Sequence, residues 1–180
     1  YDSVKDAEIV FTGVGTPPKE SGEADLSTVL EVAESIGKNL SGYTVVVTKS
    51  TVPIGTNKKI KALIEKVKDD KAEFDVASCP EFLRQGSAIS DTLYPDRIVI
   101  GSESKRAEDL LVELHKPLQK NSDCPYVLCN LETAEMIKYA ANSFLAMKIS
   151  FANSIAQLSE VTGADALRAL EGIGFDKRIG

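Results

Sequence analysis

The sequence predicts an α/β fold in which a doubly wound parallel sheet is followed by one long helix. Over residues 1–131, short apolar runs alternate with segments of helical periodicity, a pattern typical of a parallel sheet with helices on its faces. Residues 132–161 contain no Pro or Gly and are rich in Ala, Leu, Met, Ile and Phe. That composition predicts one helix of roughly 30 residues and ~45 Å. The change of character places a domain boundary near Leu131.

The expected strands are apolar runs bounded by turn residues. The first, Glu8–Val14, is almost continuously apolar, as in a parallel strand that is covered on both faces, and Gly15-Thr16-Pro17-Pro18 breaks it. Because crossovers between parallel strands are right-handed, the loops that follow the strands meet at the carboxyl edge of the sheet, where such folds bind ligands. The expected strands span residues 8–14, 43–48, 74–78, 97–101 and 126–129.

The segments between and after the strands have the spacing of amphipathic helices. Asp25 can cap the first helix, whose apolar positions begin at Leu26 and continue to Leu40. Gly163 ends the long helix, and another helix begins at Ala164. The expected helices span residues 26–40, 57–68, 107–114, 132–161 and 164–170.

Composition argues against several kinds of partner. The formal net charge of −6 argues against nucleic acid, because binding to a phosphate backbone needs a basic face. No apolar run reaches the ~18 residues of a membrane span, so no membrane partner is expected. Cys79, Cys124 and Cys129 form no metal-binding pattern, which predicts no metal site and three reduced thiols in a cytoplasmic protein. The chain opens with Tyr1 rather than Met, which indicates an excised segment.

Two of the loops that follow expected strands carry residues suited to ligand contact. Residues 13–18 (Gly-Val-Gly-Thr-Pro-Pro) follow the first strand, and glycine lets a backbone approach a ligand closely. A strand-terminating turn explains this local sequence equally well. Residues 49–53 (Lys-Ser-Thr-Val-Pro) follow the second strand, where Ser and Thr can also simply cap the next helix. The Gly-x-Gly-x-x-Gly fingerprint of dinucleotide binding does not occur in the sequence.

Charged and amide side chains complete the candidate site. Glu81 belongs to residues 80–85 (Pro-Glu-Phe-Leu-Arg-Gln), which follow the third strand. A carboxylate at that edge is either a surface charge or, if desolvated, a general base. Lys138 and Asn142 are four residues apart on the long helix and project from one face of it. A helical lysine is ordinarily a solvated charge, but a lysine and an amide side by side can also hold an oxyanion.

Taken together and in this order, these segments resemble the UDP-glucose/GDP-mannose dehydrogenase family of nucleotide-sugar 6-dehydrogenases, from about Asp6 to Gly180. The resemblance implies that residues 1–131 are the second half of an NAD-binding Rossmann-like domain. Residues 132–180 are then the long central helix and the start of the dimerisation domain. The implied fold is the C-terminal part of a Rossmann-like doubly wound parallel sheet followed by a long central dimerisation helix. NAD is the implied cofactor, and a homodimer through the long helix is the implied assembly.

The activity implied by the resemblance is NAD-dependent oxidation of a nucleotide sugar, UDP-glucose to UDP-glucuronate, by two successive hydride transfers. GDP-mannose and a UDP-N-acetylhexosamine are alternative substrates. Glu-Phe-Leu at residues 81–83 resembles the UDP-glucose and GDP-mannose branches more than the N-acetylhexosamine branch. A non-catalytic, dimeric nucleotide-sugar-binding module is a further alternative, although a pure binder does not need the Lys138 and Asn142 pair.

The resemblance also implies a role for individual residues. Thr51 positions a water, Glu81 assists proton transfer, and Lys138 with Asn142 holds the anionic oxygen of the reacting carbon. Gln85 stands where the family usually carries a second glutamate, and its amide keeps the hydrogen-bonding shape without the charge. The residues implied to contact NAD are Val14, Gly15, Thr16, Pro17, Ser50, Thr51 and Gln85. The residues implied to contact the nucleotide sugar are Glu81, Phe82, Leu83, Arg84, Lys138, Asn142 and Arg178.

Two motifs of the family do not occur in these 180 residues: the glycine-rich pyrophosphate loop and the Gly-Gly-Ser-Cys-type motif that carries the catalytic cysteine. None of the three cysteines has the context of that nucleophile. We therefore expect the 180-residue chain alone to oxidise UDP-glucose no faster than buffer does.

Overall fold

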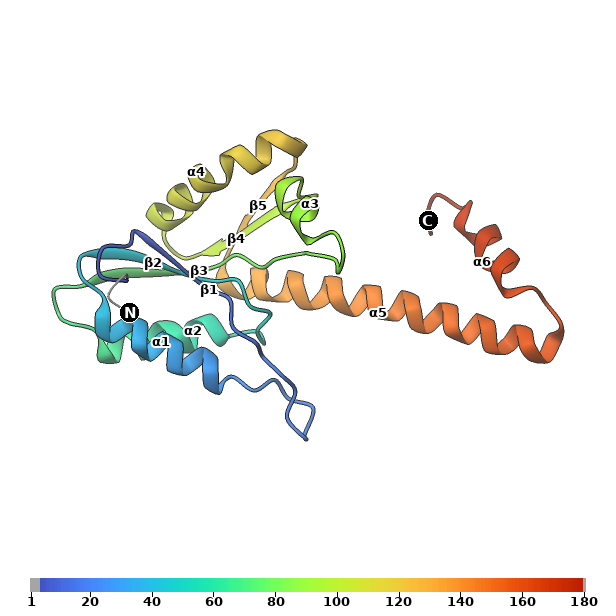
Figure 1. Ribbon diagram of the computed structural model, residues 1–180, viewed down its shortest axis with the longest axis horizontal. Helices are drawn as coiled ribbons and strands as arrows, with labels where there is room; N and C mark the ends of the chain where they lie inside the picture. Colours follow the sequence, from blue (N-terminus) through green and yellow to red (C-terminus); the bar gives the residue numbers. More distant parts are fainter. Residues whose placement is uncertain (1–3, 180) are drawn as a thin grey trace. The chain divides into compact units, whose positions relative to one another are not determined.

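The computed structural model describes residues 4–179, which form two compact units that divide between Tyr139 and Ala140 (Figure 1). The division falls inside the long helix α5 (Leu131–Thr162), whereas the change in composition lies at Leu131. The first turns of α5 belong to the first unit because Leu131, Ala134, Glu135 and Lys138 are buried there. No helix within residues 4–179 is long and apolar enough to cross a membrane.

The first unit is built on a sheet whose strands lie in the order β1-β2-β3-β4-β5. The sheet is mostly parallel, as predicted: β1–β2, β2–β3 and β4–β5 are parallel pairs. One pair corrects the expectation, because β4 runs antiparallel to β3, with Ala77 opposite Ser102 and Ser78 opposite Gly101. The strands are β1 (Ile9–Thr12), β2 (Tyr43–Thr48), β3 (Glu73–Ser78), β4 (Ile98–Ser102) and β5 (Tyr126–Cys129).

The reversal of β4 follows from the connection that precedes it. Between β3 and β4 the only helix is α3 (Ala88–Leu93), a single short piece with no buried residue. A parallel connection needs an element that crosses a face of the sheet to the opposite edge. Without one, the chain re-enters the sheet at the edge where it left. The next connection contains the long helix α4 (Lys105–Ser122), and β5 is accordingly parallel to β4.

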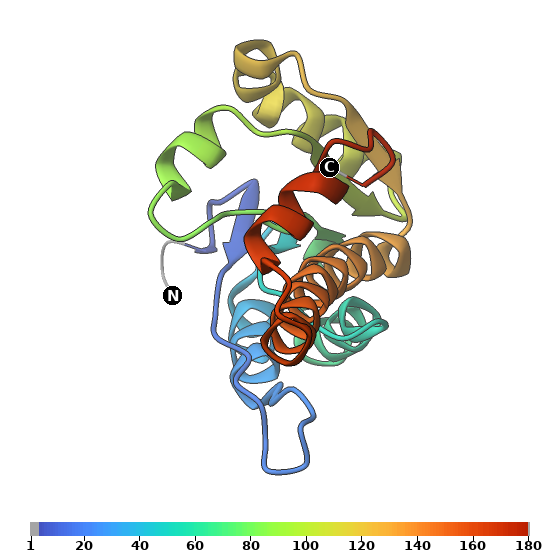
Figure 2. The same cartoon turned by 90° about the vertical axis from the view of Figure 1, so that its right-hand side faces the viewer.

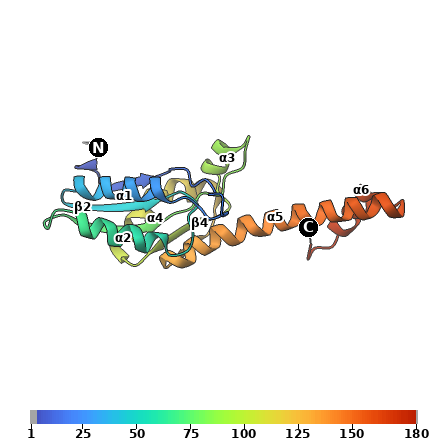
Figure 3. The ribbon, with the colours of Figure 1, turned by 90° about the horizontal axis from the view of Figure 1, so that it is seen from below.

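Helices cover both faces of the sheet, so the doubly wound arrangement is confirmed (Figures 1 and 2). Helices α1 (Ser27–Asn39) and α2 (Thr56–Val67) lie side by side on one face (Figure 3), and α4 lies on the other. Because side chains alternate along a strand, neighbouring valines of β2 enter different cores. Val46 packs with the α1 and α2 residues Val29, Ala33, Ile36, Ile60 and Ile64. Val45 and Val47 pack with Ile98, Ile100, Ala107 and Leu111.

The predicted helices are present, with differences at their ends. Asp25 accepts a hydrogen bond from the Ser27 N–H at 2.9 Å, although Leu26 and not Asp25 occupies the N-cap position of α1. Helix α4 extends from Lys105 to Ser122, beyond the predicted 107–114, and Pro117 lies inside it. The amphipathic pattern that located this helix stops at Leu114 because the following residues are mostly polar.

The second unit consists of the remainder of α5 and the helix α6 (Ala166–Gly174). Gly163, at a φ of +75°, turns the chain at the end of α5, and Asp165 caps α6 by accepting from the Arg168 N–H at 3.1 Å. This unit carries many exposed apolar side chains, which are Phe144, Leu145, Met147, Ile149, Phe151, Leu158, Val161, Leu167, Ile173, Phe175 and Ile179.

Candidate functional site

Hydrogen bonds join the two loops that follow β1 and β2. The Ser50 Oγ accepts from the Val14 N–H at 2.9 Å and donates to the Val14 carbonyl oxygen at 2.7 Å. The Thr16 hydroxyl donates to the Thr51 carbonyl oxygen at 2.8 Å. The Ser50 and Thr16 hydroxyls are thus used to hold the loops together. The Thr51 hydroxyl has no hydrogen-bond partner within residues 4–179 and is free to bind a water or a ligand.

The loops keep an open backbone at Gly15, where no heavy atom of residues 4–179, other than those of Gly15 and its two chain neighbours, lies within 4 Å of the place a Cβ would occupy. Gly13 is open in the same way. Such a surface allows a flat or extended ligand to approach the main chain closely.

The buried carboxylate of Glu135 joins α5 to the start of α2. Glu135 is 2% exposed and accepts three hydrogen bonds: from the Gly55 N–H at 2.6 Å, the Asn57 N–H at 2.8 Å and the Asn57 side-chain amide at 2.8 Å. The Asn57 side-chain oxygen in turn accepts from the Thr48 hydroxyl at 2.7 Å. The first N–H groups of a helix lack partners inside the helix, and its dipole favours a negative charge there. Glu135 therefore caps α2 from a distant part of the chain.

This cap determines where Lys138 lies. Lys138 is three residues after Glu135, on the next turn of α5, and the loop that carries Thr51 leads directly into the helix that Glu135 caps. One carboxylate thus fixes Lys138 relative to the loop of Thr51.

Lys138 and Glu81 are brought together, as a shared site requires. The Lys138 Nζ lies 3.1 Å from the Glu81 Oε1 and also donates to the Glu81 carbonyl oxygen at 2.5 Å. Lys138 is 5% exposed, so its charge is largely removed from water and is balanced locally by Glu81. The other carboxylate oxygen of Glu81 accepts from the Leu83 N–H at 2.6 Å.

The environment of Glu81 favours its charged form. Burial raises the pKa of the Glu81 carboxyl, but the Leu83 N–H and the Lys138 ammonium together outweigh burial and lower that pKa below its ordinary value. Glu81 is therefore a carboxylate at neutral pH.

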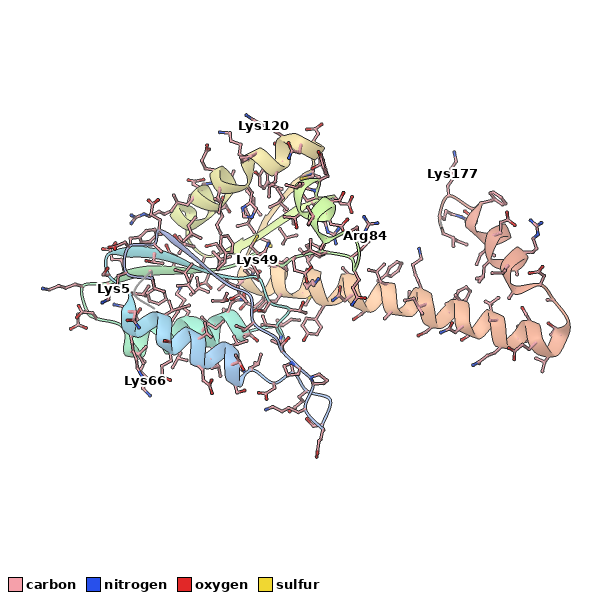
Figure 4. All side chains as sticks on the ribbon, viewed as in Figure 1. Lys5, Lys49, Lys66, Arg84, Lys120 and Lys177 are labelled. Carbon is pink, nitrogen blue, oxygen red and sulfur yellow. The ribbon has the colours of Figure 1, made fainter. Side chains whose placement is uncertain are left out.

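Arg84 and Gln85 lie on the loop after β3, and Figure 4 labels Arg84 there. The Arg84 guanidinium forms a two-point contact with Asp91, from Nη2 to Oδ1 at 2.6 Å and from Nε to Oδ2 at 3.2 Å. These hydrogen bonds hold the pKa of the Asp91 carboxyl well below its usual range. Gln85 is exposed.

Asn142 and Arg178 belong to the second unit. Asn142 is exposed on α5, one helical turn after Lys138. The Arg178 Nη2 donates to the Asp176 Oδ2 at 2.6 Å, and the guanidinium is otherwise exposed. Their relation to Glu81 and Thr51 stays a prediction.

A second cluster at the strand ends was not predicted. The Lys49 Nζ, at the end of β2 (Figure 4), lies 3.9 Å from the Cys79 Sγ, and the His115 Nε2 lies 3.7 Å from the same sulfur. Burial raises the pKa of the Cys79 thiol and lowers that of the His115 imidazole, so both groups are neutral. An uncharged, buried thiol is a poor nucleophile, which favours a packing role for Cys79.

Comparison with known proteins places the chain among nucleotide-sugar dehydrogenases. Residues 1–119 match the NAD binding domain of the UDP-glucose/GDP-mannose dehydrogenase family, and residues 132–180 match its central domain. UDP-glucose 6-dehydrogenase TuaD of Bacillus subtilis is 49% identical over 178 residues, 99% of this chain and 38% of the relative. UDP-glucose 6-dehydrogenase of Rickettsia bellii is 49% identical over 179 residues, 99% of this chain and 40% of the relative.

Solved structures show the same fold. A UDP-glucose dehydrogenase of Pyrobaculum islandicum matches with a TM-score of 0.92 and 41% identity, over 99% of this chain and 41% of that protein. A GDP-mannose dehydrogenase of Pseudomonas aeruginosa matches with a TM-score of 0.88 and 36% identity, over 97% of this chain and 40% of that protein. The chain thus spans less than half of the length of these relatives.

The contacts of Glu81 predict its titration. We expect Lys138→Met to raise the pKa of the Glu81 carboxyl, because the hydrogen bond and charge of the ammonium disappear while part of the burial remains. NMR of 13C-labelled glutamate carboxyl carbons measures this pKa. Lys49→Met is the matched control: Lys49 acts on Glu81 through charge alone, so its removal gives a smaller rise.

The lowered pKa of the Glu81 carboxyl has a consequence for the stability of the fold. A carboxyl whose pKa is lowered in the folded state contributes stability above its unfolded-state pKa and loses it as the pH falls through the folded pKa. The free energies of unfolding of the wild type and of Lys138→Met, measured with urea, should therefore become more similar as the pH falls, because the wild type loses the contribution of Glu81. An unchanged Glu81 pKa in Lys138→Met would contradict this description of the pair.

Proposed function

The chain belongs to the UDP-glucose/GDP-mannose dehydrogenase family, and from this membership we propose that it serves the NAD-dependent oxidation of a nucleotide sugar. The proposed reaction is UDP-glucose to UDP-glucuronate by two successive hydride transfers. Two relatives that are 49% identical are named UDP-glucose 6-dehydrogenases, whereas the GDP-mannose dehydrogenase is 36% identical. The observation that carries the proposal is the pairing of Lys138 with Glu81 beside the loop of Thr51.

Lys138 is proposed to stabilise the negative oxygen at the reacting carbon. An ammonium has three N–H donors, and Glu81 accepts two of them through its carbonyl and carboxylate oxygens. One donor remains for a substrate oxygen. In a site removed from water this charge favours the oxyanion of the transition state over the neutral alcohol. Asn142, one turn further along α5, is proposed to supply a second donor.

Glu81 is proposed to receive the hydroxyl proton. As Lys138 shifts towards the new oxyanion, the Glu81 carboxylate loses its counter-charge and becomes more basic at the moment when a proton is released. Thr51, whose hydroxyl has no partner within residues 4–179, is proposed to hold a water near Glu81 and the reacting carbon.

NAD, when bound, supplies the hydride acceptor. The residues proposed to line it are Val14, Gly15, Thr16, Pro17, Ser50, Thr51 and Gln85. The open backbone at Gly15 and the loops fixed by Ser50 fit a flat, extended ligand. Gln85 offers a neutral amide in place of a carboxylate, so a contact there adds no charge beside the cofactor.

The residues proposed to contact the sugar nucleotide are Glu81, Phe82, Leu83, Arg84, Lys138, Asn142 and Arg178. Each of the two arginines now pairs with a carboxylate, Arg84 with Asp91 and Arg178 with Asp176. Because a guanidinium matches phosphate oxygens with its planar fork, a diphosphate can replace or share either partner.

We propose that residues 1–131 act as the second half of the NAD-binding domain and residues 132–180 as the central helix and start of the dimerisation domain. A cytoplasmic location is proposed as well. Cys79, Cys124 and Cys129 are free, which fits a reducing compartment.

The apolar side chains of α5 support a homodimer. Phe144, Met147 and Phe151 follow helical spacing and are each more than half exposed, and large apolar side chains that are exposed together mark an interaction surface. Sedimentation is expected to show a dimer in which Phe151→Glu weakens association. Asn153→Glu, which places the same charge about half a turn away, should leave the dimer intact. A wild-type monomer at high concentration would refute the assembly.

The catalytic role of Lys138 is tested by kinetics of the full-length gene product. We expect Lys138→Ala to reduce kcat with UDP-glucose by roughly 10²–10³, the effect of removing an oxyanion donor, while substrate affinity changes much less. Lys61→Ala removes another lysine that pairs with a glutamate, Glu103 at 2.9 Å, and should leave kcat unchanged. Equal losses in turnover and affinity would instead favour a nucleotide-sugar-binding module. Comparing kcat/KM for UDP-glucose, GDP-mannose and a UDP-N-acetylhexosamine identifies the substrate.

A further inference from the structure

The reversed direction of β4 brings Arg97 to the candidate site. Gly101 of β4 pairs with Ser78, the last residue of β3, so the beginning of β4 extends past the carboxyl end of β3. Arg97 immediately precedes β4 and therefore lies beside the segment that contains Glu81 and Phe82. In a fully parallel sheet Arg97 would lie at the opposite edge, far from this segment.

The Arg97 guanidinium stacks on the Phe82 ring. Its Cζ lies 3.7 Å from the ring centroid, and the Lys138 Nζ lies 5.2 Å from the same centroid. The negative π face of the ring thus attracts two cations that come from different elements, the start of β4 and α5. Phe82 is held from both elements although it lies on a loop.

Arg97 differs from the other arginines of residues 4–179 in having no carboxylate partner there. The other four form the pairs Arg84–Asp91, Arg106–Glu73, Arg168–Glu171 and Arg178–Asp176. Within the described part of the chain, Arg97 contacts the Phe82 ring and forms no hydrogen bond or salt bridge. Its role is therefore tied to the position of that ring and not to a salt bridge.

Phe82 lies between two residues, Glu81 and Leu83, that are hydrogen-bonded to each other. The Leu83 N–H donates to the Glu81 carboxylate at 2.6 Å, which closes a tight local turn around Phe82. If the ring moves, this hydrogen bond and the direction of the Glu81 carboxylate change with it.

We propose that Arg97 is a positioning residue: by stacking on Phe82 it holds the Glu81–Phe82–Leu83 segment so that the Glu81 carboxylate faces Lys138 and the reacting group. The effect of this positioning on turnover rests on the proposed function. A planar guanidinium is needed because it can lie flat on a ring, whereas a lysine ammonium cannot make the same stack.

The first test needs no ligand and uses the 180-residue chain. We expect Arg97→Lys and Phe82→Leu each to speed hydrogen exchange of the Leu83 N–H by roughly three- to tenfold, the range of a cation–π contact of moderate strength. The double variant should exchange no faster than Phe82→Leu alone, because Arg97 acts through the ring. NMR of 15N-labelled protein measures these rates.

Arg106→Lys is the matched control. Arg106 also stacks on a ring, with its Cζ 3.4 Å from the Tyr43 centroid, but Tyr43 begins β2 and lies at the other edge of the sheet. Arg106→Lys should leave the hydrogen-exchange rate of the Leu83 N–H unchanged. Unchanged exchange in Arg97→Lys, or equal acceleration in Arg106→Lys, would overturn the proposal.

The second test uses turnover of the full-length gene product. Arg97→Lys is expected to lower kcat roughly three- to tenfold with little change in KM for NAD, and to have no further effect when Phe82 is already leucine. A loss of the same factor in both backgrounds would overturn the proposal, because Arg97 would then act without the ring. A wild-type protein without turnover would refute the proposed function, and Leu83 exchange would still decide the role of Arg97.

Discussion

The buried carboxylate of Glu135 is the interaction on which the site depends. It is buried, forms no salt bridge within residues 4–179, and accepts hydrogen bonds from three N–H donors at the start of α2. Removal of this group would leave those donors unpaired, at a cost of about 1–3 kcal/mol for each buried group. More important for function, Glu135 fixes the first turns of α5 against the loop after β2. Lys138 faces Glu81 because α5 is held in this position.

The antiparallel entry of β4 shapes the same edge of the sheet. Three parallel strands end there, and their loops supply glycines, hydroxyls and the Glu81 carboxylate. A fourth parallel strand would end there too and supply its following loop. Here the edge receives the beginning of β4 and with it Arg97, whose stack on Phe82 supports a segment that has no regular secondary structure. A short connection with the single helix α3 is sufficient to produce this arrangement.

The charge distribution explains how an acidic chain can serve an anionic ligand. The net charge is −6, yet Lys49, Lys138 and Arg97 stand near one sheet edge, and Glu81 is the carboxylate that Lys138 contacts there. Local cations in partly buried positions act on a bound phosphate or oxyanion more strongly than exposed carboxylates elsewhere, which water and salt screen. Two kinds of ionisable group, neutral and charged, lie at this edge. Cys79 and His115 are neutral and packed in the core, whereas Glu81 is charged and reaches solvent.

The sequence by itself determined the strands, every helix except the short α3, their alternation and the loops that carry Val14–Pro17, Ser50–Thr51 and Glu81–Gln85, because apolar periodicity and turn residues are local signals. It also indicated the long helix and the Lys138–Asn142 spacing. Only the tertiary structure decided the direction of β4, the cap that Glu135 provides to α2 and the stack of Arg97 on Phe82. Glu135 and Asn57 are 78 positions apart, and Arg97 meets a ring on a different element. Contacts of this kind leave no local pattern, because they form only when the sheet has brought distant segments together.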